Sequence, residues 1–263
     1  MNTDIHAVYL DLGDTFRIIR KEKDYILDAK QCIAKLCGTD QDPEAFYDEV
    51  ITPRYDVYRE WALKYYCEAP EDILWARWLA YDRDPEMIRK NSSELTYAYR
   101  RSKGRRVVVD GGVETVKELN RRGFAVGIIS DLVGKKEVDE WLDTDGLRPY
   151  FKTVQQSSIC YVRKPGPAIF YYAIEEVGIP AENSAFLGDN LDRDIIGAKA
   201  VNMGMTIAAK WGAKQYKLNE ENRPDCVIFE FPQLLDLFPE PGKVNTTAMI
   251  PPEAAWERGL GHE

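Results

Sequence analysis

The fold is decided by residues 8–16, which read VYLDLGDTF. Residues 8–10 are strand-forming and end at a carboxylate, Asp11, before a turn that carries Gly13 and then Thr15. In an open α/β sheet such a strand delivers its last side chains to the carboxyl edge, where these folds bind ligands. A carboxylate held there can attack phosphorus and form an aspartyl-phosphate. This stretch therefore predicts an α/β sheet and offers a candidate nucleophile.

Composition favours a soluble globular protein with one sizeable core. The 263 residues are long for one domain and short for two large ones, so an α/β core with an insertion fits best. Hydrophobic residues make up 44% and charged residues 30%, a balance that supports a buried core. The formal net charge is −9 without a strongly basic block, which argues against nucleic acid as a partner. Small anionic substrates stay compatible, because a few local cations and backbone amides bind them.

The cysteines and histidines exclude several kinds of chemistry. Five cysteines give an odd number with no CxxC pair, so we expect reduced thiols in a cytoplasmic protein. The histidines are His6 and His262 alone, which argues against a His-ligated zinc site and a Ser-His-Asp triad. The N-terminus is polar, and no apolar run approaches the roughly 18 residues of a spanning helix. We therefore expect no membrane segment. The sequence gives no indication of the oligomeric state.

Residues 24–103 have apolar residues at helical spacing and no convincing strand. They predict a compact helical bundle, entered through a charged, irregular crossing at 17–23 and bent at Pro53. The expected helices are 24–37, 46–65, 71–80 and 85–101. Aromatic residues are frequent here and belong mainly in the bundle core, although some could face the catalytic edge of the sheet.

From Val107 the pattern alternates between short apolar strands and amphipathic helices. This alternation predicts a doubly wound, Rossmann-like parallel sheet with right-handed crossovers and an inserted all-helical domain. The expected strands are 124–129, 153–156, 185–187, 205–208 and 226–229, and the expected helices are 113–122, 135–142, 167–177, 195–201 and 232–238. We place the α/β core at 1–20 and 104–240, the helical insertion at 21–103, and a C-terminal tail at 241–263 that is ordered only if it docks.

Polar signatures recur at predicted strand ends and helix starts, and their order is informative. They are Asp11 with Thr15, Ser130 after the strand at 124–129, Lys164 in VRKPGPAIF (residues 162–170), and Gly188-Asp189 followed by Asp194. Each is weak by itself. Together, over residues 6–238, they resemble the haloacid dehalogenase-like (HAD) superfamily, and the helical insertion between the first two signatures resembles its cap.

The resemblance implies a nucleophile and a metal site. Asp11 would take the phosphoryl group. Magnesium prefers oxygen ligands and uses one or two carboxylates beside substrate phosphate. Asp11, Asp189 and the backbone carbonyl of Gly13 would hold Mg²⁺.

The resemblance also implies the groups that hold the substrate. Ser130 and Lys164 would bind the phosphoryl oxygens, and Lys164 would offset the negative charge around Asp11. Thr15 and Asp131 would be further phosphate contacts. Asp194 and Asp14 would not touch the metal or the substrate but would orient the residues that do.

Simpler interpretations of several residues stay open. Serine is favoured at helix N-termini, so Ser130 could be a helix cap. Asp131 could mark the start of a helix, and Asp192 and Asp194 could cap the helix that follows them. Arg163 could be an ordinary surface charge.

Gly13 stands where the superfamily normally has a second aspartate, which protonates the leaving oxygen and later activates water. Such acid–base help is worth on the order of 10²- to 10⁴-fold in rate. Haloacid dehalogenases and phosphonoacetaldehyde hydrolases also lack this aspartate, but dehalogenases need no metal and typically lack the leading Asp of the motif Gly188-Asp189, which is intact here. The neighbouring Asp14 could substitute as the acid or shape the turn.

These observations leave more than one hypothesis. The first is a Mg²⁺-dependent hydrolase that acts on a small phosphorylated metabolite through an aspartyl-phosphate. The second is cleavage of a C–halogen or C–P bond, and C–P cleavage would need a cap lysine such as Lys30 or Lys64. The third is a catalytically weak HAD fold that binds or regulates. In each, the cap would read the leaving group, with Arg54, Tyr55 and Arg77 as candidates.

Overall fold

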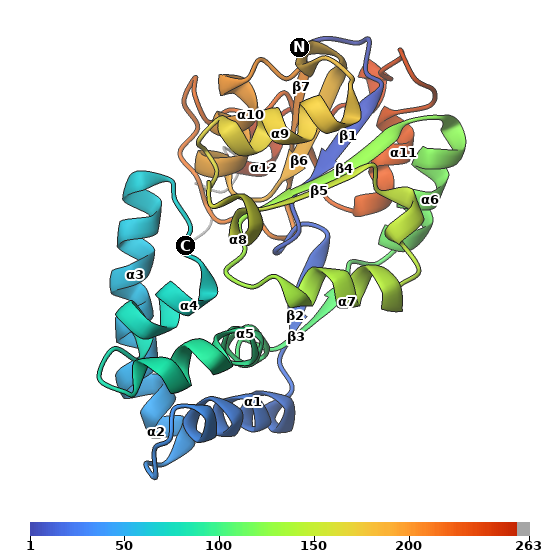
Figure 1. Ribbon diagram of the computed structural model, residues 1–263. Helices are drawn as coiled ribbons and strands as arrows, with labels where there is room; N and C mark the ends of the chain where they lie inside the picture. The colour runs from blue at the N-terminus through green and yellow to red at the C-terminus, as the bar shows by residue number, and fades with distance from the viewer. Residues whose placement is uncertain (257–263) are drawn as a thin grey trace, which may run out of the picture.

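The protein, described by a computed structural model over residues 1–256, is built on a six-stranded sheet (Figure 1). All neighbouring strands pair in parallel, in the order β5-β4-β1-β6-β7-β8. The strands are β1 (Ala7–Leu10), β4 (Ala125–Ser130), β5 (Thr153–Gln156), β6 (Ser184–Gly188), β7 (Met205–Ala209) and β8 (Cys226–Ile228). The doubly wound fold class expected from the sequence is confirmed, and the expected strands from residue 124 onward agree within one residue.

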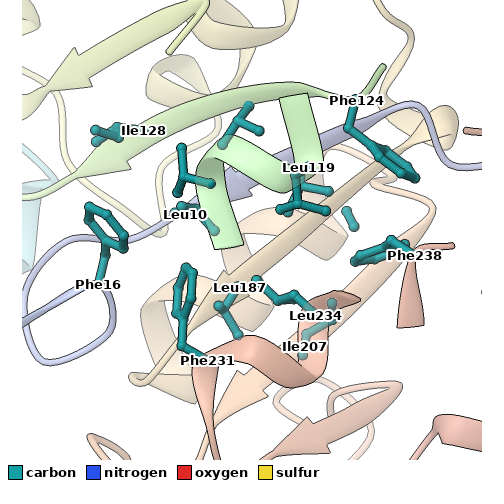
Figure 2. Packing of buried hydrophobic residues seen from close by; sticks show 14 of the residues in the cluster. Leu10, Phe16, Leu119, Phe124, Ile128, Leu187, Ile207, Phe231, Leu234 and Phe238 are labelled. Atoms are coloured by element: carbon teal, nitrogen blue, oxygen red, sulfur yellow. The ribbon is translucent and has the colours of Figure 1, made fainter. Parts of the chain in front are cut away.

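Strand β1 lies in the centre of the sheet and buries both of its faces. Its alternate side chains enter two different cores: Val8 and Leu10 pack on one face, Ala7 and Tyr9 on the other. On the first face Leu10 lies among side chains from strands and helices, as Figure 2 shows for Ile128, Leu119 and Phe231 of the same cluster. This two-sided burial explains why the strand reads as a continuous apolar run.

Helices cover both faces of the sheet. On the Leu10 face lie α6 (Gly112–Arg122), α7 (Lys136–Thr144) and α11 (Leu234–Leu237). On the Tyr9 face lie α9 (Ala168–Val177) and α10 (Ile196–Ala200). The short α8 (Ser157–Cys160) follows β5 directly. The expected helix at 195–201 begins as a π-turn, Leu191–Ile195, and the one at 232–238 begins as a 3₁₀ turn, Phe231–Gln233.

A helical cap follows β2 and has its own hydrophobic core. It comprises α1 (Lys23–Leu36), α2 (Pro43–Phe46), α3 (Thr52–Tyr65), α4 (Glu71–Leu74) and α5 (Pro85–Arg101), with π-turns at Tyr47–Ile51 and Trp75–Leu79. Trp75 and Tyr58 are fully buried in this core, as expected for most of the aromatics, whereas Tyr65 and Tyr66 are exposed. Pro53 lies in the first turn of α3, directly after the π-turn.

The crossing between sheet and cap is a two-stranded ribbon, which corrects the irregular segment expected at 17–23. Strands β2 (Arg17–Arg20) and β3 (Arg105–Val108) pair antiparallel, with Ile18 opposite Val107. Figure 1 shows this ribbon between the sheet and the cap. Both connections of the cap run through it, so the ribbon fixes where the cap begins and ends.

The C-terminal tail docks on the core as far as the structure describes it. The Val227 amide donates to the Ile250 carbonyl at 2.9 Å, and α12 (Glu253–Trp256) places Trp256 in a buried cluster beside Leu191 and Ala208. Residues 257–263 of the expected tail lie outside the described part. Within residues 1–256, no helix is long and apolar enough to cross a membrane.

Candidate active site

The site forms where β4, β1 and β6 end side by side. Leu10 of β1 is in register with Ile128 of β4 and with Leu187 of β6. Because parallel strands end at the same edge, the residues just after these positions meet there. Asp11, Ser130 and Asp189 are those residues, so the fold brings together three signatures that are far apart in sequence.

One carboxylate oxygen of Asp11 accepts hydrogen bonds, and the other accepts none within the described residues. Its Oδ1 accepts from Ser130 Oγ at 3.0 Å and from Lys164 Nζ at 2.7 Å. Its other oxygen accepts no hydrogen bond from residues 1–256 and is therefore available to a ligand. The carboxylate is only 7% exposed, so these charge-assisted contacts fix its orientation.

Lys164 is a fully buried cation between two carboxylates. Its Nζ lies 2.7 Å from Asp11 and 2.6 Å from Asp194 Oδ1, and it also donates to the Ile129 carbonyl at 3.1 Å. Burial alone would lower the pKa of Lys164, but the charges of Asp11 and Asp194 raise it above its ordinary value. Lys164 therefore stays protonated and can neutralise an anion at this edge.

Asp194 and Thr15 support the acidic side of the site. Asp194 is buried, accepts from the Asn190 amide at 3.0 Å, and packs so closely on Gly188 that a Cβ there would lie 2.3 Å from its carboxylate. Thr15 donates from Oγ1 to Asp189 Oδ1 at 3.1 Å and has no exposed surface. The direct phosphate contact expected of Thr15 is therefore not what the structure shows. Its hydroxyl orients the Asp189 carboxylate instead.

The carboxylates form a group that could hold a metal ion. Oxygens of Asp11, Asp189 and Asp194 all lie within 4.8 Å of one another. Burial, followed by the charges of Asp194 and Asp11, raises the pKa of Asp189 to about 8. An all-oxygen donor set with concentrated negative charge suits a hard divalent cation such as Mg²⁺. The residues present therefore fit the metal that the family implies.

A cavity of about 140 Å³ opens above this group. Its lining combines core residues with residues from the ribbon and the cap: Asp11, Gly13, Asp14, Ile19, Arg100, Arg106, Ser130, Asp131, Leu132, Asp189 and Arg193. Asp11, Ser130 and Asp189 come from the sheet edge, whereas Arg100 comes from α5 and Arg106 from β3. A phosphoryl group at Asp11 would thus have its leaving group near the two guanidinium groups.

Gly13 and Asp14 line the cavity side by side. A Cβ built on Gly13 would meet nothing within 4 Å, so the missing side chain leaves open space. Asp14 has a left-handed backbone (φ 58°), and its amide donates to the Arg17 carbonyl at 2.9 Å. Burial raises the pKa of Asp14, against the opposing charge of Arg106. Asp14 therefore shapes the turn and also presents a carboxyl group near the cavity.

Sequence reasoning missed the arginines of the cavity. Glu137 pairs with Arg100 at 2.6 Å and with Arg106 at 3.3 Å, so two cations share one carboxylate. The two Nη groups of Arg100 find no acceptor among residues 1–256. Burial and the neighbouring Arg100 lower the pKa of Arg106 to about 10. The only sequence signal for Arg106 is the change from polar to apolar residues at Arg105-Arg106-Val107. This change does not reveal that the segment pairs with residues 17–20.

The cap residues that we expected at the substrate do not line the cavity, and neither do the two lysines considered for C–P cleavage. Arg54 is bound by Asp82 at 2.6 Å, and neither Tyr55 nor Arg77 lines the cavity. Lys30 pairs with Asp48 at 3.1 Å, and Lys64 does not line the cavity either. Arg100 is the cap residue that lines it within the described chain.

Asp131 and Arg163 form a buried ionic group beside Lys164. Asp131 Oδ1 accepts from the Lys164 amide at 3.0 Å, and Oδ2 lies 3.5 Å from both Arg163 and Arg193. Arg163 is 6% exposed, which corrects its interpretation as a surface charge. The carboxylate of Asp131 is thus engaged with cations and the Lys164 backbone, while the residue also lines the cavity. The phosphate contact that the resemblance implies for it stays a prediction.

The chain belongs to the haloacid dehalogenase-like hydrolases: that family matches residues 18–202. The match begins beyond Asp11 and Thr15, so the family assignment does not depend on them. The helical cap and the sheet described above are the architecture that the resemblance implied.

Relatives of the chain include proteins named as phosphatases. It is 35% identical over 130 residues to a glyceraldehyde 3-phosphate phosphatase of Pyrococcus furiosus (49% of this chain, 53% of that protein). It is 30% identical over 159 residues to a phosphoglycolate phosphatase of Pseudomonas fluorescens (60% and 56%). The chain thus spans about half the length of the curated relatives it matches.

Solved structures share the fold. A HAD phosphatase from Thermococcus onnurineus superposes with a TM-score of 0.55 at 21% identity, covering 90% of this chain and all of that one. A 2-haloacid dehalogenase from Pseudomonas syringae superposes with a TM-score of 0.65 at 19% identity, covering 88% and 97%. The same fold therefore serves carbon–halogen and phosphate chemistry, and the site has to decide between them.

Proposed function

We propose that this HAD-like hydrolase is a Mg²⁺-dependent phosphatase of a small phosphorylated metabolite and that Asp11 is its nucleophile. One observation carries the proposal: Asp11 Oδ1 is held by Ser130 at 3.0 Å and Lys164 at 2.7 Å, its other oxygen accepts no hydrogen bond from residues 1–256, and the residue lines a cavity together with Asp189. A fixed carboxylate with one free oxygen is what an in-line attack on phosphorus requires.

The first step is transfer of the phosphoryl group to Asp11. The free carboxylate oxygen forms a bond to phosphorus while the bond from phosphorus to the leaving oxygen breaks, and the leaving oxygen takes a proton from solvent water. Ser130 and Lys164 stabilise the negative charge on the transferred group. Asp11 and Asp189, supported by Asp194 and the Gly13 carbonyl, would hold Mg²⁺, which supplies charge neutralisation for phosphoryl transfer when bound.

The second step is hydrolysis of the aspartyl-phosphate. Water attacks phosphorus, the bond from phosphorus to the Asp11 oxygen breaks, and inorganic phosphate leaves with Asp11 restored. This water gives its proton to solvent, because Gly13 offers no side chain to take it. The proposed enzyme therefore favours substrates whose leaving groups need little acid assistance.

The cavity limits the substrate. Its volume of about 140 Å³ suits a phosphoryl group with a compact leaving group. The Nη groups of Arg100, which have no acceptor within residues 1–256, would suit a leaving group with oxygen atoms. Phosphoglycolate and glyceraldehyde 3-phosphate, named for the relatives, carry such oxygen atoms, but as unactivated esters they should turn over more slowly than acyl phosphates, which are the substrates to try first.

The test is a phosphate-release assay with and without Mg²⁺ on acetyl phosphate and p-nitrophenyl phosphate, beside Asp11→Asn. We expect Mg²⁺-dependent turnover that the variant abolishes. Turnover that survives in Asp11→Asn would overturn the proposal. Binding of phosphate esters without turnover would favour the regulatory hypothesis, which has Gly13 in its support.

Carbon–halogen cleavage is the second candidate, because Gly13 and the fold likeness to a 2-haloacid dehalogenase both allow it. The acidic group at Asp189 favours phosphate chemistry, since a metal is not needed for dehalogenation. Chloride release from a 2-haloacid without metal would support dehalogenation. C–P cleavage through a cap lysine has no support, because no lysine lines the cavity in the described chain.

A further inference from the structure

The cap touches the loop that carries Lys164 through paired backbone. The Glu68 amide donates to the Tyr161 carbonyl at 3.0 Å, and the Arg163 amide donates to the Tyr66 carbonyl at 2.9 Å. Cys67 lies opposite Val162 in this short antiparallel bridge. The connection between α3 and α4 is therefore joined to the chain directly before Lys164.

A buried ion pair seals this junction. Glu68 is 3% exposed, and its carboxylate accepts hydrogen bonds from Tyr58 of the cap, from Ser157 Oγ at 2.8 Å, and from the Arg163 guanidinium. Ser157 and Arg163 belong to the sheet domain, so the cap's carboxylate is satisfied largely by core donors. Separating the cap at this point would leave the Glu68 carboxylate with Tyr58 as its one remaining donor of the three, and the loss of a charged partner is costly for a buried carboxylate.

From the ion pair a chain of contacts runs to the proposed nucleophile. Arg163 Nη2 lies 3.5 Å from Asp131 Oδ2. Asp131 Oδ1 accepts from the Lys164 amide at 3.0 Å, and Lys164 Nζ lies 2.7 Å from Asp11. The position of the cap is thus connected to the position of Lys164 through charged and hydrogen-bonded neighbours.

We propose that Glu68 is a positioning residue which places Lys164 at Asp11 when the cap is docked. Glu68 fixes Arg163, and Arg163 fixes Asp131 and the Lys164 backbone, so the reactive arrangement is complete only in this position of the cap. The proposal rests on the proposed phosphatase function. It differs from a purely structural role, which would lower stability and leave turnover by the folded enzyme unchanged.

The first test separates turnover from binding in Glu68→Gln, which keeps size and removes charge. A displacement of about 1 Å near the reacting groups costs on the order of 10²-fold in rate. We expect kcat for acetyl phosphate to fall by roughly 10- to 100-fold with KM changed little, the pattern of a lost transition-state interaction. Arg163→Met should do the same, and the double variant should lose no more than either single one.

Glu94→Gln is the matched control. Glu94 on α5 pairs with Lys136 on α7 at 2.7 Å, so it also joins cap and core, but it does not touch the Lys164 loop. We expect its kcat to equal that of the wild type. An unchanged kcat in folded Glu68→Gln, or an equal loss in Glu94→Gln, would overturn the positioning role.

Hydrogen exchange gives a readout that does not need turnover. In the wild type the Glu68 and Arg163 amides should be protected, and Glu68→Gln should lose protection at both while the sheet strands keep theirs. A wild type without phosphatase activity would overturn the proposed function alone, because exchange still reports the junction. Unchanged protection at these amides in Glu68→Gln would overturn the proposed coupling of cap and Lys164 loop.

Discussion

Gly13 leaves an open space beside the proposed nucleophile, because a Cβ there would have no neighbour within 4 Å. An aspartate should therefore fit and supply the missing proton transfer. We predict that Gly13→Asp raises kcat for unactivated esters such as phosphoglycolate by about 10- to 100-fold, toward the lower end of acid–base effects. The gain should be small for p-nitrophenyl phosphate, whose leaving group needs little acid. Steady-state kinetics on both substrates measure the difference.

Gly13→Asn is the control for this prediction, since it fills the same space without a titrating carboxyl. It should give no rate gain. An equal gain in both variants would show that space filling, and not proton transfer, changes the rate.

Asp189 gives the proposed metal site a pH dependence. Its pKa is raised to about 8, mainly by burial and then by Asp194 and Asp11, so in the metal-free protein its carboxyl holds a proton below that pH. A raised carboxyl pKa contributes stability that is lost as the pH rises through about 8, and metal binding must displace the proton. Mg²⁺ should therefore bind more tightly with rising pH, by about tenfold per unit for one proton, until about pH 8.

Thermal unfolding with and without Mg²⁺ measures this effect. The rise in Tm caused by Mg²⁺ should be larger near pH 8.5 than near pH 6.5, and Asp189→Asn should remove it. A rise of the same size at both pH values would contradict a site governed by Asp189.

Among the elements, β1, β4 and β6 were predictable because their information is local. Each is a short apolar run that ends in a polar residue, and the parallel sheet then brings Asp11, Ser130 and Asp189 to one edge without further assumptions. Lys164 was predictable only by resemblance, because nothing in its local sequence indicates that it is buried between two carboxylates.

The ribbon of β2 and β3 was not predictable, because its stability depends on pairing between segments far apart in sequence. The cavity position of Arg106 was not predictable for the same reason, because it depends on this pairing. The same holds for Glu68 and Arg163, which read as ordinary charged residues until the cap is folded against the core.

Helix α5 supplies the proposed contact to the leaving group through Arg100. Hydrogen bonds to charged groups are worth about 1.5–3 kcal/mol, so Arg100→Met should lower kcat/KM for phosphoglycolate by roughly 10- to 100-fold. Acetyl phosphate, with a smaller leaving group, should be affected much less. Arg101→Met, on the same helix but paired with Asp28 outside the cavity, should change neither value. Equal losses on both substrates in Arg100→Met would contradict a role at the leaving group.

At the scale of the whole molecule, we propose that the sheet supplies the reaction centre and the cap completes it. The sheet edge carries Asp11, Ser130, Lys164 and Asp189, whereas the cap contributes Arg100 to the cavity and Glu68 to the Lys164 loop. In this proposal the groups at the sheet edge set the chemistry and the cap sets the leaving group, so that one fold can serve different reactions.

The measurement that tests the central claim most directly is capture of the phosphorylated protein. The protein is mixed with acetyl phosphate and Mg²⁺, quenched in acid during turnover, and digested for peptide mass spectrometry. We predict a phosphoryl group on the peptide that contains Asp11, absent in Asp11→Asn and without Mg²⁺. Turnover by the wild type with the phosphoryl group on another residue, or with none on Asp11 at any time of quenching, would contradict the account.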